Sequence, residues 1–402
     1  MSQFAGRLFH WLCVVCCVMR GVADAPLLRA ADPETASGPT YNLLEGNSLE
    51  GWTAENGCDV AVDYGVLLLK GGDGWVRSDH TYADFKLHLE WKALQKANYD
   101  AGIFIRTPRE GKPFPEHGYQ INLLQGKEGN IGNLPGATST GLVKPVGEWN
   151  TFDITVVGET VTLDINGKRA YSVPGLKVAA GYIGFQVEVP LGGKFMIRKV
   201  QITELGAKSL FNGNDLTHWE GAGKPAEACW EVQEGLLTCT GKPGPWLKSK
   251  EEYGDFNLRL DYQVSDGGNS GVYVRVPADG KHHRQEETEP PAGFEVQILD
   301  DAAAQYRDLK DYQYSASVYD IAGAKPHLSK GPGRWNTLEI NCLGQHVIVT
   351  HNGTVVVDAD EEHFPLLKLR STKGFLGLQN HSTLVKFRNV RIAPAMGARG
   401  GN

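Results

Sequence analysis

The amino-acid sequence predicts an all-β protein made of two tandem domains, each a jelly roll or two-sheet β-sandwich. Three observations support this fold class: a repeat that spans nearly the whole chain, runs in which apolar and polar residues alternate, and Asn-Gly pairs between such runs. Alternation with a period of two is typical of strands with one dry face, and Asn-Gly favours the tight turns that join them. Helical periodicity is scarce, so we expect helices to be minor.

The repeat sets the domain boundaries. "LLEGNSLEGW" (43–52) returns as "LFNGNDLTHW" (210–219), and "YADFKLHLEW" (82–91) returns as "YGDFNLRLDY" (253–262). Further matches keep the same order, and each copy is longer than a solenoid repeat, which indicates duplication of a complete domain. We therefore expect one domain over residues 40–205 and a second over residues 208–394.

The N-terminus has the order of a cleaved secretory signal. Arg7 is followed by an apolar run of about ten residues and then by Ala23-Asp24-Ala25. We expect residues 1–25 to be a signal peptide, residues 26–39 a flexible leader and residues 395–402 a loose tail. The apolar run is too short to cross a bilayer as a helix, so the protein is expected to be secreted or periplasmic, without a membrane partner after cleavage.

Strands are clearest where the alternation is longest. In "DFNLRLDYQV" (255–264) the apolar Phe256, Leu258 and Leu260 alternate with polar residues, which predicts a strand. Asn166-Gly167 and Asn352-Gly353 each separate two such runs and predict hairpins. Many short strands of this kind favour a sandwich or jelly roll.

Cysteines and net charge limit the remaining choices. Cys229 and Cys239 flank a predicted hairpin whose turn lies near Glu234-Gly235, so they are either a disulfide or two thiols; Cys58 and Cys342 are expected to be unpaired. The net charge of −7, without a basic patch, argues against a nucleic-acid partner.

Several motifs of the second copy together resemble a known family. "LFNGNDLTHW", "GNSGVYVR", "GFEVQILD", "GRWNTLEI" and "GLQNHSTLVKFRNVRI" are similar to the successive motifs of the 3-keto-disaccharide hydrolase family. The resemblance implies a concanavalin A-like sandwich for each domain and a sugar-binding groove on a concave sheet. The resemblance covers residues 208–394 best, whereas the first copy matches the family motifs less closely.

Three predicted strands of the second copy aim polar side chains away from the core. Strand alternation puts them on the face opposite apolar neighbours such as Val296 and Ile298. The polar set comprises Tyr273 and Arg275 in "SGVYVR", Glu295 and Gln297 in "GFEVQILD", and Gln379 and His381 in "GLQNHS". We expect Arg275, Glu295, Gln297 and His381 to converge. Asp300 would need a bulge to join them.

The resemblance also implies a chemistry for this set. A ketone at C3 of a sugar acidifies the proton on C2, so that one base can start the expulsion of the C1 group, and water can then add. His381 or Glu295 would be the base or acid, and Arg275 would face the developing oxyanion. Tyr273, Gln297, Gln379 and Asp300 would contact the substrate.

Each of these residues also has a purely structural interpretation. Arg275 could pair with Glu295 as a bridge, Gln297 could bond to a loop, and His381 could cap a turn. Asp300 could be a turn carboxylate. These alternatives stay open at the level of sequence.

Three classes of function follow. The first is an exported hydrolase, by a lyase and hydratase route, acting on 3-keto-glycosides or related glycosides. The second is a non-catalytic carbohydrate-binding sandwich, and the third is an extracellular structural protein. A divalent metal on Glu295, Asp300 and His381 is conceivable, although no compact ligand motif supports it. His282-His283 lies in a polar loop that could form a groove rim or lid.

The two copies differ at the candidate positions. Where the second copy has Glu295, Gln297, Asp300 and His381, the first has Gln120, Asn122, Gln125 and Glu188, while Arg106 matches Arg275. An amide cannot serve as a general base. We therefore expect the chemistry in the second domain, with the first as a binding or structural partner.

Overall fold

The computed structural model describes residues 37–397. The predicted signal peptide (1–25), most of the predicted leader (26–39) and the end of the predicted tail (395–402) lie outside the described residues and stay predictions. Within the described part, no helix is both long enough and apolar enough to cross a membrane.

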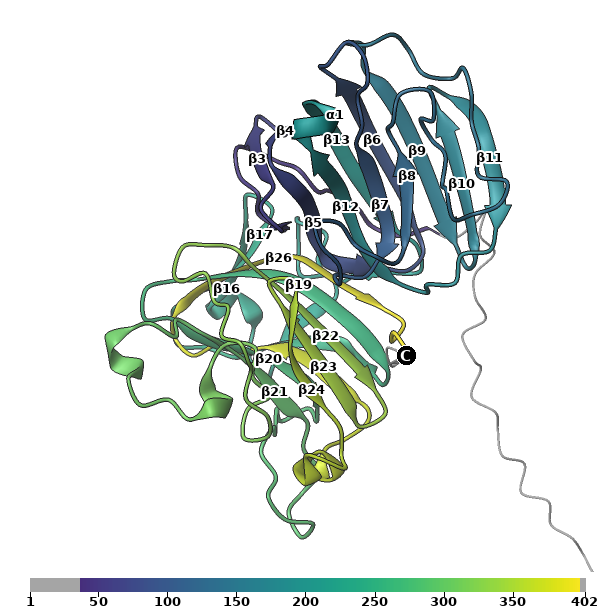
Figure 1. Ribbon diagram of the computed structural model, residues 1–402. Helices are drawn as coiled ribbons and strands as arrows, with labels where there is room; N and C mark the ends of the chain where they lie inside the picture. The colour runs from purple at the N-terminus through teal and green to yellow at the C-terminus, as the bar shows by residue number, and fades with distance from the viewer. Residues whose placement is uncertain (1–36, 398–402) are drawn as a thin grey trace, which may run out of the picture. The chain divides into compact units, whose positions relative to one another are not determined.

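The first domain consists of a sheet of eight strands and a sheet of five (Figure 1). In the larger sheet the order is β11-β10-β9-β6-β13-β4-β3, with β1 beside β13, and in the smaller it is β2-β5-β12-β7-β8. One short helix, α1 (Val189–Gly192), follows β12. The strands are β1 (Thr40–Asn42), β2 (Trp52–Glu55), β3 (Asp59–Asp63), β4 (Val66–Gly71), β5 (Asp73–Tyr82), β6 (Phe85–Ala93), β7 (Gly102–Thr107), β8 (Tyr119–Asn122), β9 (Asn150–Val157), β10 (Thr160–Ile165), β11 (Lys168–Pro174), β12 (Gly181–Glu188) and β13 (Phe195–Glu204).

The second domain repeats this topology. Its larger sheet has the order β16-β17-β26-β19-β22-β23-β24, with β14 beside β26, and its smaller sheet has the order β15-β18-β25-β20-β21. The strands are β14 (Lys208–Ser209), β15 (Trp219–Gly221), β16 (Trp230–Gln233), β17 (Leu236–Thr240), β18 (Leu247–Tyr253), β19 (Phe256–Val264), β20 (Asn269–Val276), β21 (Phe294–Leu299), β22 (Asn336–Leu343), β23 (His346–His351), β24 (Thr354–Ala359), β25 (Gly374–Leu378) and β26 (Leu384–Ala393).

Four sheets in two sandwiches confirm the predicted all-β fold class. Within the described residues, the helical segments of the second domain are short 3-10 helices in the connections between strands: Ala226–Ala228, Ala304–Tyr306, Asp311–Gln313 and Pro365–Leu369.

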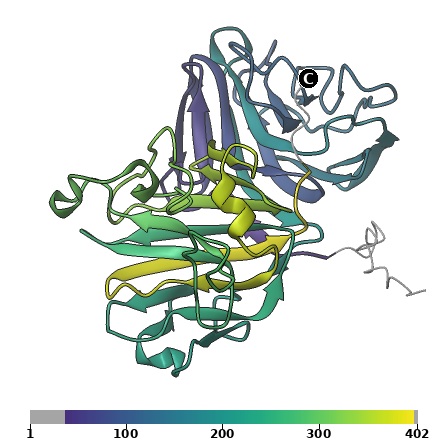
Figure 2. The same ribbon diagram turned by 90° about the horizontal axis from the view of Figure 1, so that it is seen from below.

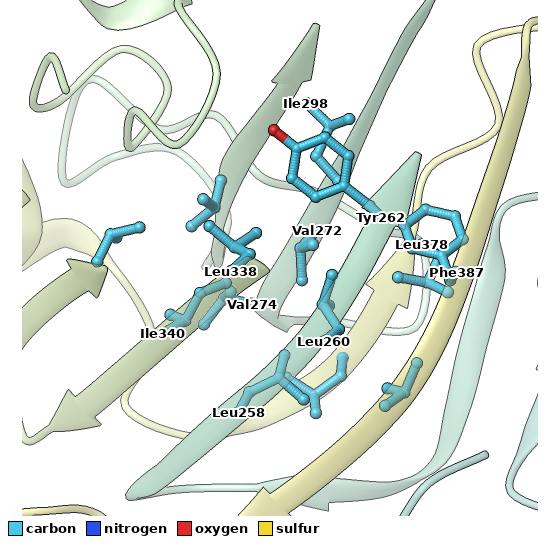
Figure 3. Close-up of a cluster of buried hydrophobic side chains, with 14 of the residues drawn as sticks. Leu258, Leu260, Tyr262, Val272, Val274, Ile298, Leu338, Ile340, Leu378 and Phe387 are labelled. Atoms are coloured by element: carbon cyan, nitrogen blue, oxygen red, sulfur yellow. The ribbon is translucent and has the colours of Figure 1, made fainter. Parts of the chain in front are cut away.

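The core of the second domain lies between its two sheets (Figure 3). Leu258, Leu260 and Tyr262 of β19 are buried, as the alternation predicts, and they belong to one cluster with Val272 of β20 and Ile298 of β21. Full burial of one such aliphatic side chain contributes about 1.5–3 kcal/mol. This packing fixes which side of β20 and β21 faces away from the core.

The turns follow the sequence signals. Asn166 and Gly167 join β10 to β11 with φ of 52° and 76°, and Asn352 and Gly353 join β23 to β24 with φ of 47° and 75°. Positive φ at both turn residues is what Asn-Gly supplies at low steric cost. Both predicted hairpins are confirmed.

The four cysteines within residues 37–397 are free thiols. Cys229 and Cys239 are buried beside the β16–β17 hairpin, and both are free, as are Cys58 and Cys342. The thiol of Cys239 lies 3.3 Å from Oδ1 of Asn380. Of the two alternatives for this pair, the structure therefore has the unbonded one.

Two long connections of the second domain carry no long regular element. One runs from β20 to β21 and the other from β21 to β22, and Figure 2 shows the light-green segment that follows β21 projecting to the left of the sheets. Long loops in a compact domain are often functional.

Candidate active site

A cavity of about 240 Å³ opens over the smaller sheet of the second domain. This volume is below the roughly 300–1,000 Å³ of sites for drug-sized ligands, so it suits a group the size of one sugar ring. Its walls come from the sheet and from both long connections. The lining residues are Asn269, His282, His283, Glu295, Gln297, Tyr319, Gln379 and His381.

Three neighbouring strands, β25, β20 and β21, form the floor. Tyr273 of β20 is opposite Glu295 on one side and Gly377 on the other. Cross-strand partners project from the same face of a sheet, so the glutamate and the tyrosine share this face. The alternation on β21 predicted that sidedness.

A glycine beneath Glu295 makes room for its carboxyl group. A Cβ atom at Gly271 of β20 would lie 1.9 Å from Oε1 of Glu295. No real Cβ contact is that short, so the carboxyl group can lie across β20 only because position 271 has no side chain.

Burial determines the protonation of Glu295. The alternation of β21 predicted a polar face turned away from the core, but all six of its residues are buried, and Glu295 is 4% exposed. Desolvation, with the nearby charge of Asp320, raises the pKa of Glu295 to about 8. The carboxyl group therefore carries a proton at neutral pH and can act as an acid.

Gln297 presents a donor to the cavity. Its Oε1 accepts the N–H of Ile298 at 3.1 Å, which leaves the amide –NH₂ as the free end of the side chain. Gln297 is 6% exposed, so this group is held in a fixed, partly dry place.

His282 lies directly against the acid. Its Nε2 is 3.4 Å from Oε2 of Glu295, its ring stacks on Tyr273 with centroids 4.6 Å apart, and its Nδ1 is 2.8 Å from the carbonyl oxygen of Gly280. A carbonyl accepts only a donor, so Nδ1 carries the hydrogen, and in the neutral ring Nε2 is an acceptor. Burial, first of all, lowers the pKa of His282, which favours that neutral form.

His283 is held by a carboxylate. Its Nδ1 lies 2.8 Å from Oδ2 of Asp320, and the edge of Tyr319 packs 5.5 Å from its ring. A carboxylate on Nδ1 orients an imidazole and leaves Nε2 as the basic nitrogen. Asp320 has φ of 61°, a left-handed backbone conformation that is uncommon for a residue with a side chain.

Main-chain bonds tie the wall around Tyr319 to the sheet. The N–H of Tyr319 donates to the carbonyl of Glu295 at 2.8 Å, and the N–H of Gln297 donates to the carbonyl of Ser317 at 3.0 Å. The aspartate that orients His283 therefore comes from a segment anchored to the strand of the acid.

Two amide oxygens at the cavity lack partners among the described residues. Gln379 donates from Nε2 to the hydroxyl of Tyr273 at 3.1 Å, but its Oε1 accepts no bond. Oδ1 of Asn269 is also buried and unbonded. Buried acceptors without donors are costly, and sugar hydroxyls are suitable donors.

Comparison with known proteins decides the family. The model of the 3-keto-alpha-glucoside-1,2-lyase-like domain matches residues 39–203 and again residues 206–393. The chain belongs to this family. The 3-keto-alpha-glucoside-1,2-lyase-like proteins are glycoside hydrolase-like and carbohydrate-active. This chain carries two such domains in tandem.

Individual relatives match one domain's length. A 3-keto-disaccharide hydrolase of Bacteroides thetaiotaomicron is 26% identical over 228 residues, which cover 46% of this chain and 78% of that protein. Two solved structures from Parabacteroides distasonis, both described as provisionally assigned glycosyl hydrolases, are 29% and 22% identical. They cover 47% and 48% of this chain and 98% and 94% of their own, each with a TM-score of 0.39.

The first 3-keto-alpha-glucoside-1,2-lyase-like domain has amides where the second has its acid. Gln120 of β8 is opposite Phe104, as Glu295 is opposite Tyr273, and it hydrogen-bonds Gln186. Gln186 in turn donates to Glu188 at 2.9 Å. These side chains satisfy one another, and no imidazole is among them.

The structure brings four of the predicted site residues to one cavity and corrects the position of a fifth. Glu295, Gln297, Gln379 and His381 all line it, and their catalytic or binding roles stay predictions. Arg275 does not. It is fully buried and donates to the carbonyl of Gly254 at 2.8 Å, to the carbonyl of Gly344 at 2.5 Å and to Asp255 at 3.1 Å.

A bulge explains the error for Arg275. The register between β20 and β25 shifts between Tyr273 and Val276, and Arg275 has φ of 52°. One extra residue in a strand reverses the facing of the side chains beyond it. The expected convergence of Arg275 with Glu295 is therefore wrong.

Asp300 and Tyr273 also lie outside the lining. Oδ2 of Asp300 accepts the N–H of Gly267 at 2.9 Å, which is the turn-carboxylate interpretation. Tyr273 lies beneath the cavity, where it supports His282 and Gln379.

The suggested metal ligands are not gathered. Asp300 is turned away from the cavity that Glu295 and His381 share, and no group of three or more His, Cys, Asp or Glu side chains in residues 37–397 is arranged to hold a metal ion.

The sequence reading missed three members of the site. Asn269 has the strand spacing of Gly271 and Tyr273 and could have been found by extending that alternation by one step. Tyr319 and Asp320 lie in a connection without periodicity, so no local signal marked them. His282 and His283 belong to the loop for which a groove rim and a lid were both open, and both line the cavity.

Proposed function

We propose that the second domain cleaves 3-keto-glycosides by elimination across C1–C2 followed by addition of water. The observation that carries this proposal is the pairing, in one small cavity, of a buried carboxyl group that holds its proton, Glu295, with an imidazole oriented by a carboxylate, His283 with Asp320. Acid and base are the two groups that the reaction requires.

In the first step, Nε2 of His283 takes the proton from C2, which the C3 ketone has acidified. The C2–H electron pair forms the C1–C2 double bond as the C1–O bond breaks. The departing oxygen leaves as an alcohol with the proton of Glu295. In the second step, Glu295 takes a proton from water as the hydroxyl adds to C1, and His283 returns its proton to C2. The net reaction is hydrolysis.

Negative charge develops on the C3 oxygen within each of these steps, as the C2 proton leaves before the C1–O bond has broken and again as the hydroxyl adds to C1. The –NH₂ of Gln297 is a donor on the floor that is not committed to a protein acceptor among the described residues. Preorganised donors of this kind stabilise an enolate because they need not reorient during the reaction. Gln297 takes, in this mechanism, the role that the family resemblance implied for Arg275.

Recognition of the ring falls to the unbonded acceptors. Oε1 of Gln379 and Oδ1 of Asn269 can each accept a sugar hydroxyl. A site with buried acceptors rejects analogues that lack the matching hydroxyl, since the acceptor would then stay unpaired. His381, which is exposed at the mouth, would contact the group on C1 or the solvent side of the ring.

The test is turnover of a panel of 3-keto-glycosides beside their unoxidised parents. We expect release only from the 3-keto compounds, and we expect Glu295→Gln and His283→Ala each to lower kcat by about 10²–10⁴-fold.

His363→Ala is the matched control, because the Nδ1 of His363 lies 2.8 Å from Asp360 in the same geometry but on the exposed surface. It should keep full turnover. Release from the parents alone would contradict the proposal, as would full activity of Glu295→Gln. Binding of the sugar by the unaltered protein without any turnover would favour a carbohydrate-binding module instead.

A further inference from the structure

Arg370 is a buried cation with too few partners. It is 3% exposed, and its guanidinium makes one side-chain hydrogen bond, from Nη1 to the carbonyl of Arg284 at 2.7 Å. Its Nε and Nη2 are buried and find no acceptor among the described residues. No carboxylate in that part of the chain forms an ion pair with it. A buried charge without a partner is costly, so stability alone does not account for it.

The position of Arg370 joins it to the loop of the two histidines. Arg284 of that loop donates from Nη1 to the carbonyl of Leu369 at 3.1 Å, and Arg370 returns a bond to the carbonyl of Arg284. Ala292, at the end of the loop, forms a main-chain bridge with Arg370. The arginine is therefore fixed beside the segment that carries His282 and His283.

A small number of charged or titratable groups surround Arg370 and the two histidines. His282 faces Glu295 at 3.4 Å, and His283 faces Asp320 at 2.8 Å. The charges of Asp320 and Glu289 favour the cation of Arg370, and that of Arg284 opposes it. In the opposite direction, the cation of Arg370 disfavours a positive charge on His282, after the larger effects of burial and of the charge of His283. The carbonyl of Gly280 and the charge of Asp320 favour that positive charge.

His282 and Glu295 compete for one proton. Nε2 of His282 lies 3.4 Å from Oε2 of Glu295, so the pair can hold one proton in two ways, as acid beside imidazole or as carboxylate beside imidazolium. Only the first arrangement leaves Glu295 able to protonate a departing oxygen. A fixed positive charge near His282 favours that arrangement, because it disfavours the imidazolium.

We propose that Arg370 is a positioning residue of the active site, which holds the histidine loop and keeps the shared proton on Glu295 rather than on His282. The inference deepens the proposed function and depends on it for its catalytic meaning, but the place of the proton can be measured without substrate.

The experiment compares Arg370→Gln, which removes the charge, with Arg370→Lys, which keeps it, by NMR titration of the His282 ring in the full chain. We expect Arg370→Gln to raise the titration midpoint of His282 above that of the unaltered protein. Arg370→Lys should stay close to the unaltered protein. Arg307→Gln, at an exposed arginine outside this arrangement, is the matched control for loss of an arginine.

Turnover gives the second readout. We expect Arg370→Gln to lower kcat by about tenfold or more with little change in KM, and Arg370→Lys to recover most of that loss. A folded Arg370→Gln protein with an unchanged His282 midpoint would overturn the proposal, since the arginine would then be only a structural tie. Failure of Arg370→Gln to fold would overturn it too, because loss of an under-bonded buried cation should be tolerated.

The two proposals fail separately. If the His282 midpoint shifts as expected but no 3-keto-glycoside is turned over by the unaltered protein, the inference about the proton stands and the proposed function does not.

Discussion

Glu295 illustrates how a single residue acquires its chemistry from its place in the strand. β21 is buried on both faces, so the carboxyl group is desolvated, and the open side of Gly271 lets it lie across the neighbouring strand. The cost of removing a carboxylate from water appears as a pKa of about 8. The acid of the site is therefore made by packing and not by a special sequence.

This burial predicts how stability depends on pH. The folded protein holds the Glu295 proton up to about pH 8, whereas the unfolded chain loses it near the ordinary value of 4.5. The contribution to stability is fully present below about pH 4.5 and is lost as pH rises to about 8, by a few kcal/mol. Chemical denaturation at several pH values should show this slope, and Glu295→Gln should reduce it. Equal slopes in both proteins would contradict the prediction.

The sequence predicted the position of a side chain correctly where the alternation within one strand determines which face it projects from. Alternation was enough to place Glu295 and Gln297 on one face. It failed at Arg275, because the bulge after Tyr273 depends on pairing with β25, which is about a hundred residues away in the chain. Alternation also gave no sign of the contact between His283 and Asp320, because these residues lie in two connections without a periodic pattern.

The element that organises the site is the trio of strands β25, β20 and β21. Its shape relies on residues without side chains: a Cβ at Gly377 would lie 2.4 Å from the ring of Trp246, as one at Gly271 would meet Glu295 at 1.9 Å. The same device recurs in the first domain, where a Cβ at Gly102 would lie 2.1 Å from Nε2 of Gln120. In both domains, glycine allows a side chain of a neighbouring strand to lie close over the backbone of the sheet.

Gly271→Ala tests this arrangement. The added methyl group should displace the carboxyl group of Glu295 and lower turnover of 3-keto-glycosides by about a hundredfold or more, since small misplacements at a reacting centre are that costly. Gly102→Ala makes the same change against an amide and should leave turnover intact. Thermal unfolding should show a similar loss of stability, about 1–3 kcal/mol, in both. Equal turnover in the two variants would refute the role given to Gly271.

The strands and hairpins themselves were largely visible in the sequence. The repeat predicted two similar domains, and the Asn-Gly pairs predicted hairpin turns because they favour one local backbone conformation. Together these signals predicted the fold class. The order of strands within a sheet, such as β25 beside β20, was not visible, since it is set by packing between distant segments.

The whole molecule carries one topology twice with different chemistry. In the first domain Gln186 bonds to both Gln120 and Glu188, whereas the second has an acid, two adjacent imidazoles and unbonded acceptors over the corresponding strands. Duplication followed by loss of titratable groups in one copy fits this contrast.

We therefore expect one binding site for substrate per chain. Calorimetric titration of the Glu295→Gln protein with a 3-keto-glycoside should give a stoichiometry near one. Gln120→Ala, added to that protein, should not change it. Two equivalents per chain, with one lost in the Gln120→Ala protein, would show that the first domain also binds the sugar.

β21 is the last strand of its sheet, and an uncovered last strand invites other chains to pair with it. Here Ala316, Ser317 and Tyr319 occupy its outward hydrogen-bonding groups. The segment that delivers Asp320 to the imidazole thus also guards the protein against aggregation. A substitution that frees this segment should make the protein less soluble as well as less active.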